Sequence, residues 1–486
     1  MLNWIKNNLF VHRSLGQVLV KNVFWLMSGE AVSRVVRAGV VIYAARILGA
    51  ASYGAFAFAT AIANFLAILS DFGVTPILSR EIARDPERKK YHLLHGVLLK
   101  AGLLFINVVA VLLIIPQFVT LEESKMLFPL LAVMLVFDSA RDLIMAVLRA
   151  MERMELEAGV KIFSNLLIAG VGLYFLKVFA TSYSLMGAYV IGGGLGFVLA
   201  LLLLLPFLEK KKVIISRASL RAMLSSSWPL AILALIGTVL LSTDVVMLGW
   251  LSSPEEVGFY AAAQRPIILF YMFFGLVGSA LFPVIMRLSK EGVLPKLRRI
   301  AEVGMRTNLA VALPMVVGGF LLREQIILLL YEIPYLAAIS SFTILLFTFI
   351  AMVPSGVLTN FIIAYDMQRR FFKFSIFTAI FNILLNFTLV PIFGIVGAAC
   401  ATLSSQILIS FFLIRSARKI IRFNPLQKSL KIFLAALIMG GSIVLLQTVV
   451  SSVLALIGIG MIIYIAVLLV LREGLVADMF KVMRTN

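Results

Sequence analysis

Stretches of apolar residues recur along the whole chain, and short polar segments separate them. At about 20 residues, each stretch is long enough to cross a hydrocarbon core of about 30 Å as an α-helix. The stretches lack the alternation of a membrane barrel strand and are about twice as long as one. The pattern therefore predicts an all-α polytopic membrane protein with about fourteen transmembrane helices. The predicted helices lie near residues 23–46, 53–77, 93–115, 126–148, 160–180, 185–207, 227–250, 259–285, 303–322, 339–363, 374–391, 396–415, 430–450 and 453–471.

The composition supports a membrane protein and argues against an enzyme. Of the 486 residues, 62% are hydrophobic and 14% are charged, whereas soluble domains are about half apolar and a quarter charged. The single cysteine excludes a disulfide within the chain, and the three histidines are not placed as a metal cluster. The sequence contains no nucleotide-binding loop, nucleophile elbow or zinc-protease motif. We therefore expect no enzymatic activity and no cofactor, apart from a coupling ion.

Alternate connections between the predicted helices are rich in Lys and Arg, as at residues 80–90, 209–221, 287–299 and 415–423. The intervening connections carry almost no basic residues. Basic loops of membrane proteins stay in the cytoplasm, so this alternation predicts a multi-pass protein of the cell (inner or plasma) membrane with both termini cytoplasmic. The net charge of +20 is then explained by basic loops that set the topology and contact anionic membrane lipids, and it does not indicate nucleic-acid binding.

An internal repeat of about 200 residues is suggested by two pairs of similar segments. Residues 44–61 resemble 245–263, and residues 185–193 resemble 395–403. A repeat of six helices keeps its orientation, so two six-helix lobes should be related by a pseudo-twofold axis along the membrane normal, with a central cavity. The expected parts are an interfacial N-terminus (1–22), an N-lobe (23–208), a basic cytoplasmic linker (209–226), a C-lobe (227–415), and a C-terminal helix pair with a cytoplasmic tail (416–486).

Charged residues occur inside the predicted helices, where lipid would reject them. Glu30, Arg34 and Arg37 are spaced i, i+4 and i+7, which places them on one face of the first helix. Each charge left in hydrocarbon would cost at least about 2.5–3.5 kcal/mol, so this face must meet water or a partner. A second charged face in the fourth helix and two residues of the second half extend the pattern. These are Asp138, Arg141, Asp142, Asp244 and Arg265.

Two interpretations of these charges remain open. They could form local ion pairs that hold helices together, Glu30 with Arg34 and Arg141 with either aspartate. Alternatively, the arginines line a wet cavity and bind phosphate, whose oxygens match the planar, permanently charged guanidinium group. Positive charge is left after pairing, notably at Arg37, so we favour the second interpretation. The predicted site for an anionic head is Arg34, Arg37, Arg265 and Arg141, and the candidates for H⁺ or Na⁺ coupling are Glu30, Asp138, Asp142 and Asp244.

Two segments carry a family resemblance. In residues 46–84 the matching positions are Arg46, Leu48, Gly49, Tyr53, Gly54, Asp71, Phe72, Gly73, Arg80 and Glu81, and residues 244–265 match a second motif. The chain resembles the polysaccharide flippases, the O-antigen-type lipid-linked oligosaccharide translocases of the multidrug/oligosaccharidyl-lipid/polysaccharide exporter superfamily. The resemblance implies two lobes around a central cationic cavity that opens to each side in turn, with Arg34, Arg37 and Arg265 lining it.

The same resemblance implies a flippase that moves a polyprenyl-(di)phosphate-linked oligosaccharide from the cytoplasmic to the outer leaflet by alternating access, driven by an ion gradient. Its partners would be the lipid-linked oligosaccharide, membrane lipids and a glycosyltransferase or polymerase complex. Three alternatives stay open: a peptidoglycan-precursor (lipid II-type) flippase, a multidrug/cation antiporter of the same fold, and a structural subunit of a glycan-assembly complex. The arginines argue against the antiporter, whose cationic substrates would need an acidic cavity.

Overall fold

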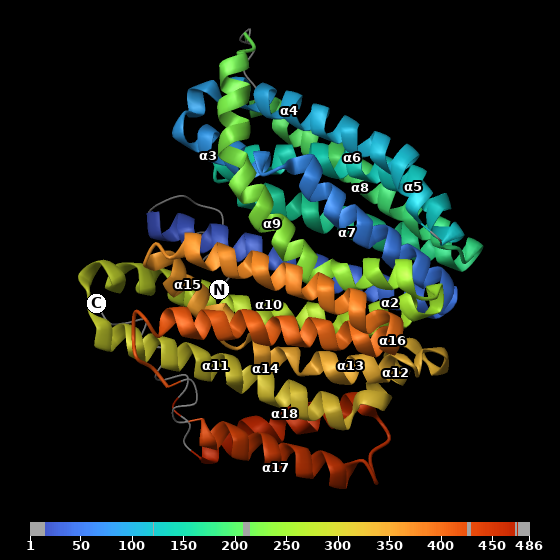
Figure 1. Cartoon of the computed structure of the whole chain (residues 1–486), viewed down its shortest axis with the longest axis vertical. Coiled ribbons are helices and arrows are strands. Elements are labelled where there is room, and N and C mark those ends of the chain that lie inside the picture. Colours follow the sequence, from blue (N-terminus) through green and yellow to red (C-terminus); the bar gives the residue numbers. More distant parts are fainter. Residues whose placement is uncertain (1–14, 120, 208–213, 425–428, 472–473, 475–486) are drawn as a thin grey trace, which may run out of the picture. The chain divides into compact units, whose positions relative to one another are not determined.

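The computed structural model describes residues 15–119, 121–207, 214–424, 429–471 and 474, and helices form all the regular structure in these ranges (Figure 1). The predicted interfacial residues up to 14 and residues 209–213 of the linker lie outside them. The α-helices are α2 (Leu15–Asp71), α3 (Val74–Arg84), α4 (Lys89–Val109), α5 (Ile115–Phe118), α6 (Glu122–Ala150), α7 (Met154–Phe179), α8 (Ser182–Leu204), α9 (Arg217–Leu251), α10 (Pro254–Glu291), α11 (Leu294–Leu321), α12 (Arg323–Tyr331), α13 (Ala338–Leu346), α14 (Thr348–Met352), α15 (Ser355–Ala364), α16 (Gln368–Ala417), α17 (Leu430–Leu446) and α18 (Val453–Val470). Shorter turns are η1 (Pro86–Arg88), the π-helical η2 (Ala110–Ile114), η3 (Leu205–Phe207) and η4 (Ile333–Tyr335).

Among the described residues, 10 helical segments are long and apolar enough to cross a membrane, which confirms the polytopic all-α class. Two of them bend within their length and each contain two predicted helices, because Gly49 interrupts α2 and Gly394 interrupts α16 with a positive φ. Helix α6 is not among the 10, since it carries three charges in its central part, and α17 has only 17 residues. The count of about fourteen spans stays a prediction.

The second predicted helix ends earlier than expected. Helix α2 stops at Asp71 rather than near residue 77, and Phe72 and Gly73 take positive φ values of 45° and 75° before α3 begins. A Cβ on Gly73 would meet the carbonyl oxygen of Ser227 in α9, so glycine permits both the left-handed turn and the close approach of α9. The Asp71 carboxylate then accepts a hydrogen bond of 3.2 Å from the backbone N–H of Thr75.

The chain divides into two compact units, residues 1–250 and 251–486. In unit 1, α2 packs along α7 and also against α6, while α8 packs against both α6 and α7. Helix α9 belongs to this unit, since a Cβ on Gly249 would meet the ring of Phe58 in α2. The sequence repeat placed this helix in the C-lobe, which was predicted to begin at residue 227. The division between the two compact units instead falls after residue 250. The lobe boundaries themselves stay a prediction.

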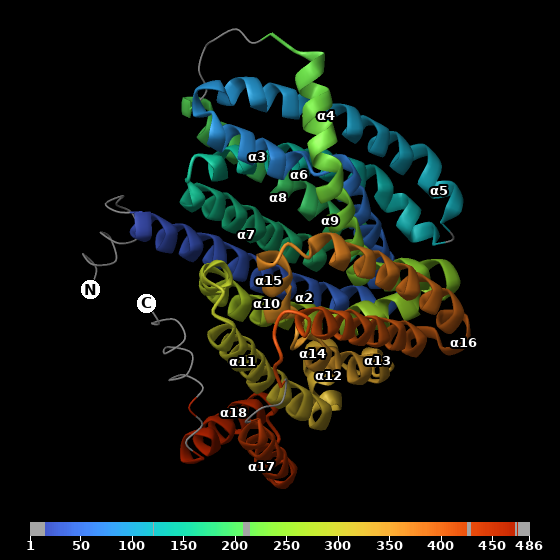
Figure 2. The ribbon, with the colours of Figure 1, turned by 60° about the vertical axis from the view of Figure 1, so that its left-hand side comes forward.

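Unit 2 is built around α10, α11 and α16. Helix α10 packs against α11, α13 and α15, and α16 packs against α13, α14 and α15. The C-terminal helices α17 and α18 pair with each other and lie against α11 (Figure 2). Tyr464 of α18 donates a hydrogen bond of 2.9 Å to the Ala310 carbonyl, and Gln447 donates one of 3.3 Å to the Leu321 carbonyl. Side-chain hydrogen bonds therefore fix this pair to the unit.

Small residues of α8 set how closely it approaches α7, and this gives a first prediction. A Cβ on Gly192 would lie 2.9 Å from the Ile168 backbone nitrogen and 3.0 Å from the Ser164 carbonyl oxygen, whereas a Cβ on Gly187 would lie 3.8 Å from its nearest neighbour, in Phe175. Gly192→Ala should therefore destabilise the protein by about 1–3 kcal/mol, because backbone atoms must move apart. Gly187→Ala, on the same helix, should be neutral or stabilising by up to about 1 kcal/mol.

Thermal unfolding of the two variants in detergent, beside the unmodified protein, measures this difference. A clearly lower melting temperature is expected for Gly192→Ala only. Equal melting temperatures for the two variants would show that α7 and α8 do not pack as closely as described.

Candidate functional site

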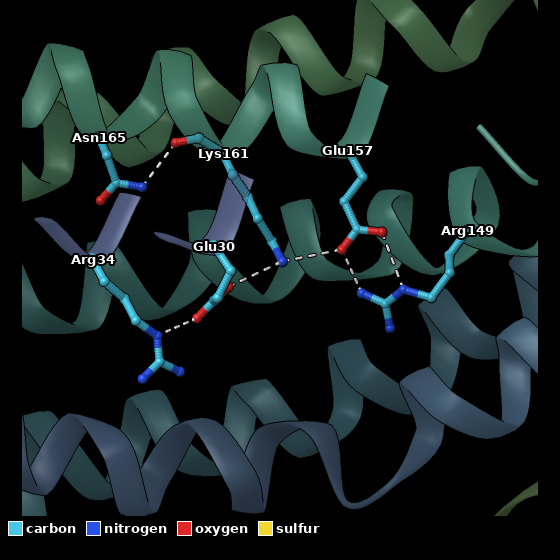
Figure 3. Close-up of polar contacts among 6 residues, drawn as sticks. All are labelled: Glu30, Arg34, Arg149, Glu157, Lys161 and Asn165. Carbon is cyan, nitrogen blue, oxygen red and sulfur yellow. Dashed lines mark hydrogen bonds and ion pairs between the residues drawn. The ribbon is translucent and has the colours of Figure 1, made fainter. Parts of the chain in front are cut away.

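A row of alternating charges joins helices α2, α7 and α6 in unit 1 (Figure 3). We call Arg34, Glu30, Lys161, Glu157 and Arg149, in this order, the charge ladder. The Arg34 Nε lies 2.7 Å from Glu30 Oε1, and the Lys161 Nζ lies 3.6 Å from Glu30 Oε2 and 3.1 Å from Glu157 Oε1. Arg149 binds Glu157 with two atoms, Nη2 at 2.5 Å and Nε at 3.1 Å. The ladder thus connects three helices through ion pairs, with charge-assisted hydrogen bonds at Arg34 and Arg149.

Local spacing and one close helix contact explain why the ladder forms. Glu30 and Arg34 are four residues apart on α2, as are Glu157 and Lys161 on α7, so each pair shares a helix face. The two faces meet because Gly29 lies directly against Ala158: a Cβ on Gly29 would come within 2.9 Å of the Ala158 Cβ. This close approach of α2 and α7 brings Glu30 within reach of Lys161.

The two carboxylates of the ladder differ sharply in burial. The Glu157 side chain is 0% exposed, whereas the Glu30 side chain is 45% exposed. The cations lie between these limits, with exposed side-chain fractions of 43% for Arg34, 32% for Lys161 and 41% for Arg149. The ladder therefore contains one buried carboxylate, Glu157, which contacts two cations, and one accessible carboxylate, Glu30.

Arg37 continues the charged face of α2 but binds neutral partners. Its Nε donates a hydrogen bond of 3.0 Å to Asn165 Oδ1, and its guanidinium carbon lies 5.7 Å from the centre of the Tyr189 ring. The Asn165 amide donates in turn to the Lys161 carbonyl oxygen at 2.8 Å, which fixes the orientation of its oxygen toward Arg37. An amide and a ring orient the guanidinium without neutralising it.

The site as a whole carries surplus positive charge. In the ladder, three cations alternate with two carboxylates, and Arg37 adds a further cation. Guanidinium and ammonium groups at such spacing suit a tetrahedral oxyanion, for which arginine offers paired donors and lysine a point charge. Within the described ranges, no group of three or more His, Cys, Asp or Glu side chains is arranged to hold a metal.

The ion pairs that local spacing suggests are both present. Besides Glu30 with Arg34, the Arg141 Nη2 lies 2.7 Å from Asp138 Oδ1 on α6. The next residue, Asp142, is exposed. A Cβ on Gly193 of α8 would lie 3.5 Å from Asp138 Oδ1, so the Asp138–Arg141 pair faces α8. Three of the four predicted arginines therefore lie in unit 1, two on α2 and one on α6.

The remaining predicted residues lie elsewhere in the fold. Asp244 is buried in α9, with 1% of its surface exposed, and Arg265 is half-buried in α10 of unit 2. Each of them interacts with another group of the protein. A binding role for the predicted arginines and a coupling role for the predicted acids, like the central cavity, stay predictions.

Several charged residues of the site were missed by sequence reasoning. Lys161, Glu157 and Arg149 lie at or near the ends of predicted helices, where charges are common. A clearer signal was Lys100, which stands inside the predicted span 93–115. Its side chain is 3% exposed, and its Nζ lies 2.9 Å from Asp71 Oδ1 and 3.2 Å from Thr75 Oγ1. This ion pair of a buried lysine secures α4 to the break between α2 and α3.

Comparison with known families places the chain. Residues 19–289 match the family described as polysaccharide biosynthesis protein, and residues 229–388 match the family described as MatE.

Three curated relatives are archaeal. The probable flippase AglR of Haloferax volcanii is 29% identical over 184 residues, covering 37% of this chain and 39% of the relative. An uncharacterized membrane protein of Methanocaldococcus jannaschii, MJ1068, is 26% identical over 225 residues, covering 46% and 44%. The matches thus span less than half the length of these two relatives. The probable low-salt glycan biosynthesis flippase Agl15 of Haloferax volcanii is 23% identical over 382 residues, covering 74% of this chain and 75% of the relative.

Solved transporter structures share the fold. A lipid II flippase MurJ in an inward closed conformation aligns with a TM-score of 0.73 at 19% identity, covering 93% of this chain and 99% of the other. An inward-facing multidrug resistance MATE family transporter of the MOP superfamily aligns with a TM-score of 0.66 at 14% identity, covering 80% and 94%. Because the family match covers more than half of its length, the chain belongs to the polysaccharide biosynthesis protein family, a branch of the multidrug/oligosaccharidyl-lipid/polysaccharide exporter superfamily.

Proposed function

We propose that the chain is a flippase that moves a polyprenyl-(di)phosphate-linked oligosaccharide from the cytoplasmic to the outer leaflet. Its family, the names of AglR and Agl15 and the fold it shares with a lipid II flippase support a transporter of lipid-linked glycans. The observation that carries the proposal is the surplus positive charge on α2 and α7. A helix that is otherwise apolar bears accessible cations, and a phosphorylated headgroup is an anion that a membrane transporter of glycans meets.

The cations at the accessible end of the ladder suit a diphosphate. Arg34 and Arg37 are three residues apart, about 4.5 Å along the helix axis, a separation that lets each contact one of two adjoining phosphate groups. Lys161 approaches from α7 and supplies a third positive charge near Arg34, through their shared partner Glu30. Arg141 and Arg265 remain proposed contacts for other parts of the anionic head.

The ladder also suggests how a headgroup enters. Under the proposed topology the connection between α6 and α7 faces the cytoplasm. From Glu157, near the start of α7, to Asn165 the helix rises about 12 Å, so the cations extend from that side into the bundle. The headgroup and sugars would follow this polar path while the polyprenyl tail stays in lipid, and rocking of the two lobes would expose the headgroup outside. A glycosyltransferase or polymerase complex would supply and use the cargo.

A prediction about Arg37 tests the function. In proteoliposomes that contain the purified chain and a polyprenyl-diphosphate-linked oligosaccharide, Arg37→Ala should lower the transport rate by about 10- to 100-fold, as expected for loss of a hydrogen bond to a charged group. Arg37→Lys should retain part of the activity, because it keeps the charge but not the planar fork. Transport is measured as the fraction of sugar that becomes accessible to a lectin on the far side.

Arg84→Ala is the matched control, since Arg84 is 68% exposed, lies at the end of α3 and pairs with Glu81 rather than with a residue of the ladder. Transport at the unmodified rate by a folded Arg37→Ala variant would contradict the phosphate-binding role. Parallel assays with a lipid II-type cargo and with a cationic drug separate the alternatives. Uptake of the drug alone would identify an antiporter, and no transport of any cargo would favour a structural subunit.

Energy coupling gives a further prediction. We propose that an H⁺ or Na⁺ gradient drives transport, since one elementary charge gains about 2.3 kcal/mol per 100 mV. The candidate carriers remain Glu30, Asp138, Asp142 and Asp244.

Asp138→Asn should abolish the acceleration that an imposed gradient produces while leaving slow gradient-free exchange, because the amide cannot exchange a proton or balance the charge of a cation. The rate with and without a gradient is compared within one preparation, with Asp85→Asn as control. An unchanged ratio in Asp138→Asn would exclude this residue as the carrier.

A further inference from the structure

Glu30 occupies an unusual place among the acidic residues of the ladder. It is the accessible anion between two cations, and each of its carboxylate oxygens contacts one of them, Arg34 at 2.7 Å and Lys161 at 3.6 Å. A phosphate group between these two cations would present its oxygens to the same donors. The carboxylate therefore stands where an anionic ligand of the ladder would bind.

We propose that Glu30 is an internal counter-anion, which the phosphate of the cargo displaces from Arg34 and Lys161. The inference rests on the proposed function and deepens it, because it names the residue that determines which anions the site accepts. An anion must compete with the resident carboxylate for both cations. A diphosphate does so through its higher charge and several oxygens, whereas a monovalent anion such as acetate offers nothing that Glu30 lacks.

The contrast with Glu157 explains why Glu30 is the anion that moves. Glu157 is fully buried, holds Arg149 with both oxygens and also contacts Lys161, so moving it would break contacts to two cations at once. The Glu30 side chain is nearly half exposed, so it has room to move away from the two cations.

Two cations of the site, Lys161 and Arg37, would keep their places after Glu30 leaves. Lys161 retains its contact of 3.1 Å with Glu157, and Arg37 retains its hydrogen bond with Asn165. Cations that other residues already hold in position need little rearrangement when the ligand binds, which lowers the free-energy cost of binding.

The test is titration calorimetry of the purified full-length chain in detergent with inorganic pyrophosphate. Glu30→Gln should bind pyrophosphate about threefold to tenfold more tightly than the unmodified protein, since the competing ion pair is partly exposed and of modest strength. Its preference for pyrophosphate over acetate should also fall. Glu157→Gln should bind pyrophosphate more weakly, because Lys161 and Arg149 lose the group that holds them.

Two controls separate a local effect from a change in net charge. Glu81→Gln changes the net charge equally but lies on α3 beside Arg80, so it should leave the affinity unchanged. Glu30→Gln combined with Arg34→Ala should lose the gain in affinity. A repeat with farnesyl diphosphate in the micelles should show the same gain for Glu30→Gln, and a gain confined to free pyrophosphate would contradict displacement by a lipid headgroup.

Equal or weaker binding by Glu30→Gln would overturn the proposal, as would the absence of pyrophosphate binding in both proteins. The proposed function fails by a different observation, the absence of transport of the polyprenyl-diphosphate-linked oligosaccharide by the unmodified protein in proteoliposomes. Tighter pyrophosphate binding by Glu30→Gln together with normal flipping by Arg37→Ala would keep the counter-anion and reject the transport role of the site.

Discussion

A charge inside a bundle of membrane helices needs a partner or water, and this constraint organises unit 1. The charge ladder meets it by alternating cations and carboxylates across α2, α7 and α6. The alternation depends on a small-residue contact, Gly29 against Ala158, because side chains on two helices can bridge only where the backbones approach closely. Packing and electrostatics therefore depend on each other here. The close contact makes the ion pairs between helices possible, and the ion pairs in turn hold the helices together.

The structural and the functional interpretations of the charges apply to different charged residues of unit 1. Arg149 and Lys161 with the buried Glu157, and the buried Lys100 with Asp71, are ion pairs of the kind that hold helices together. Arg37 differs because its partners, Asn165 and Tyr189, orient the guanidinium but leave its charge uncompensated. Neutral groups that hold a cation in place suit an anion site, because they do not compete with the ligand as the Glu30 carboxylate does at Arg34 and Lys161.

The sequence predicted the helices well, because about 20 apolar residues between basic loops are a signal that each segment carries by itself. Spacing along one helix also offered the pairs Glu30–Arg34 and Asp138–Arg141 as one of two interpretations, although it left Asp142 open as the partner of Arg141. It did not predict the link from Glu30 to Lys161 or from Arg149 to Glu157, because these depend on which helices are neighbours. The break at Phe72 and Gly73 escaped for a related reason: its glycine is required by α9, more than 150 residues later in the chain.

An accessible counter-anion has a consequence for a transporter that alternates between two sides of a membrane. After the headgroup leaves, the site must return empty, and unpaired cations would then stand in surroundings that disfavour them. If Glu30 returns to Arg34 and Lys161, the empty site has nearly the charge balance of the loaded one, and the cost of the return step falls. The same carboxylate would also prevent weakly charged anions from occupying the cations during that step. On the proposed mechanism, one residue therefore contributes both to selectivity and to the return of the empty carrier, and it can do so because Glu157 holds Lys161, and Asn165 holds the neighbouring Arg37, without help from Glu30.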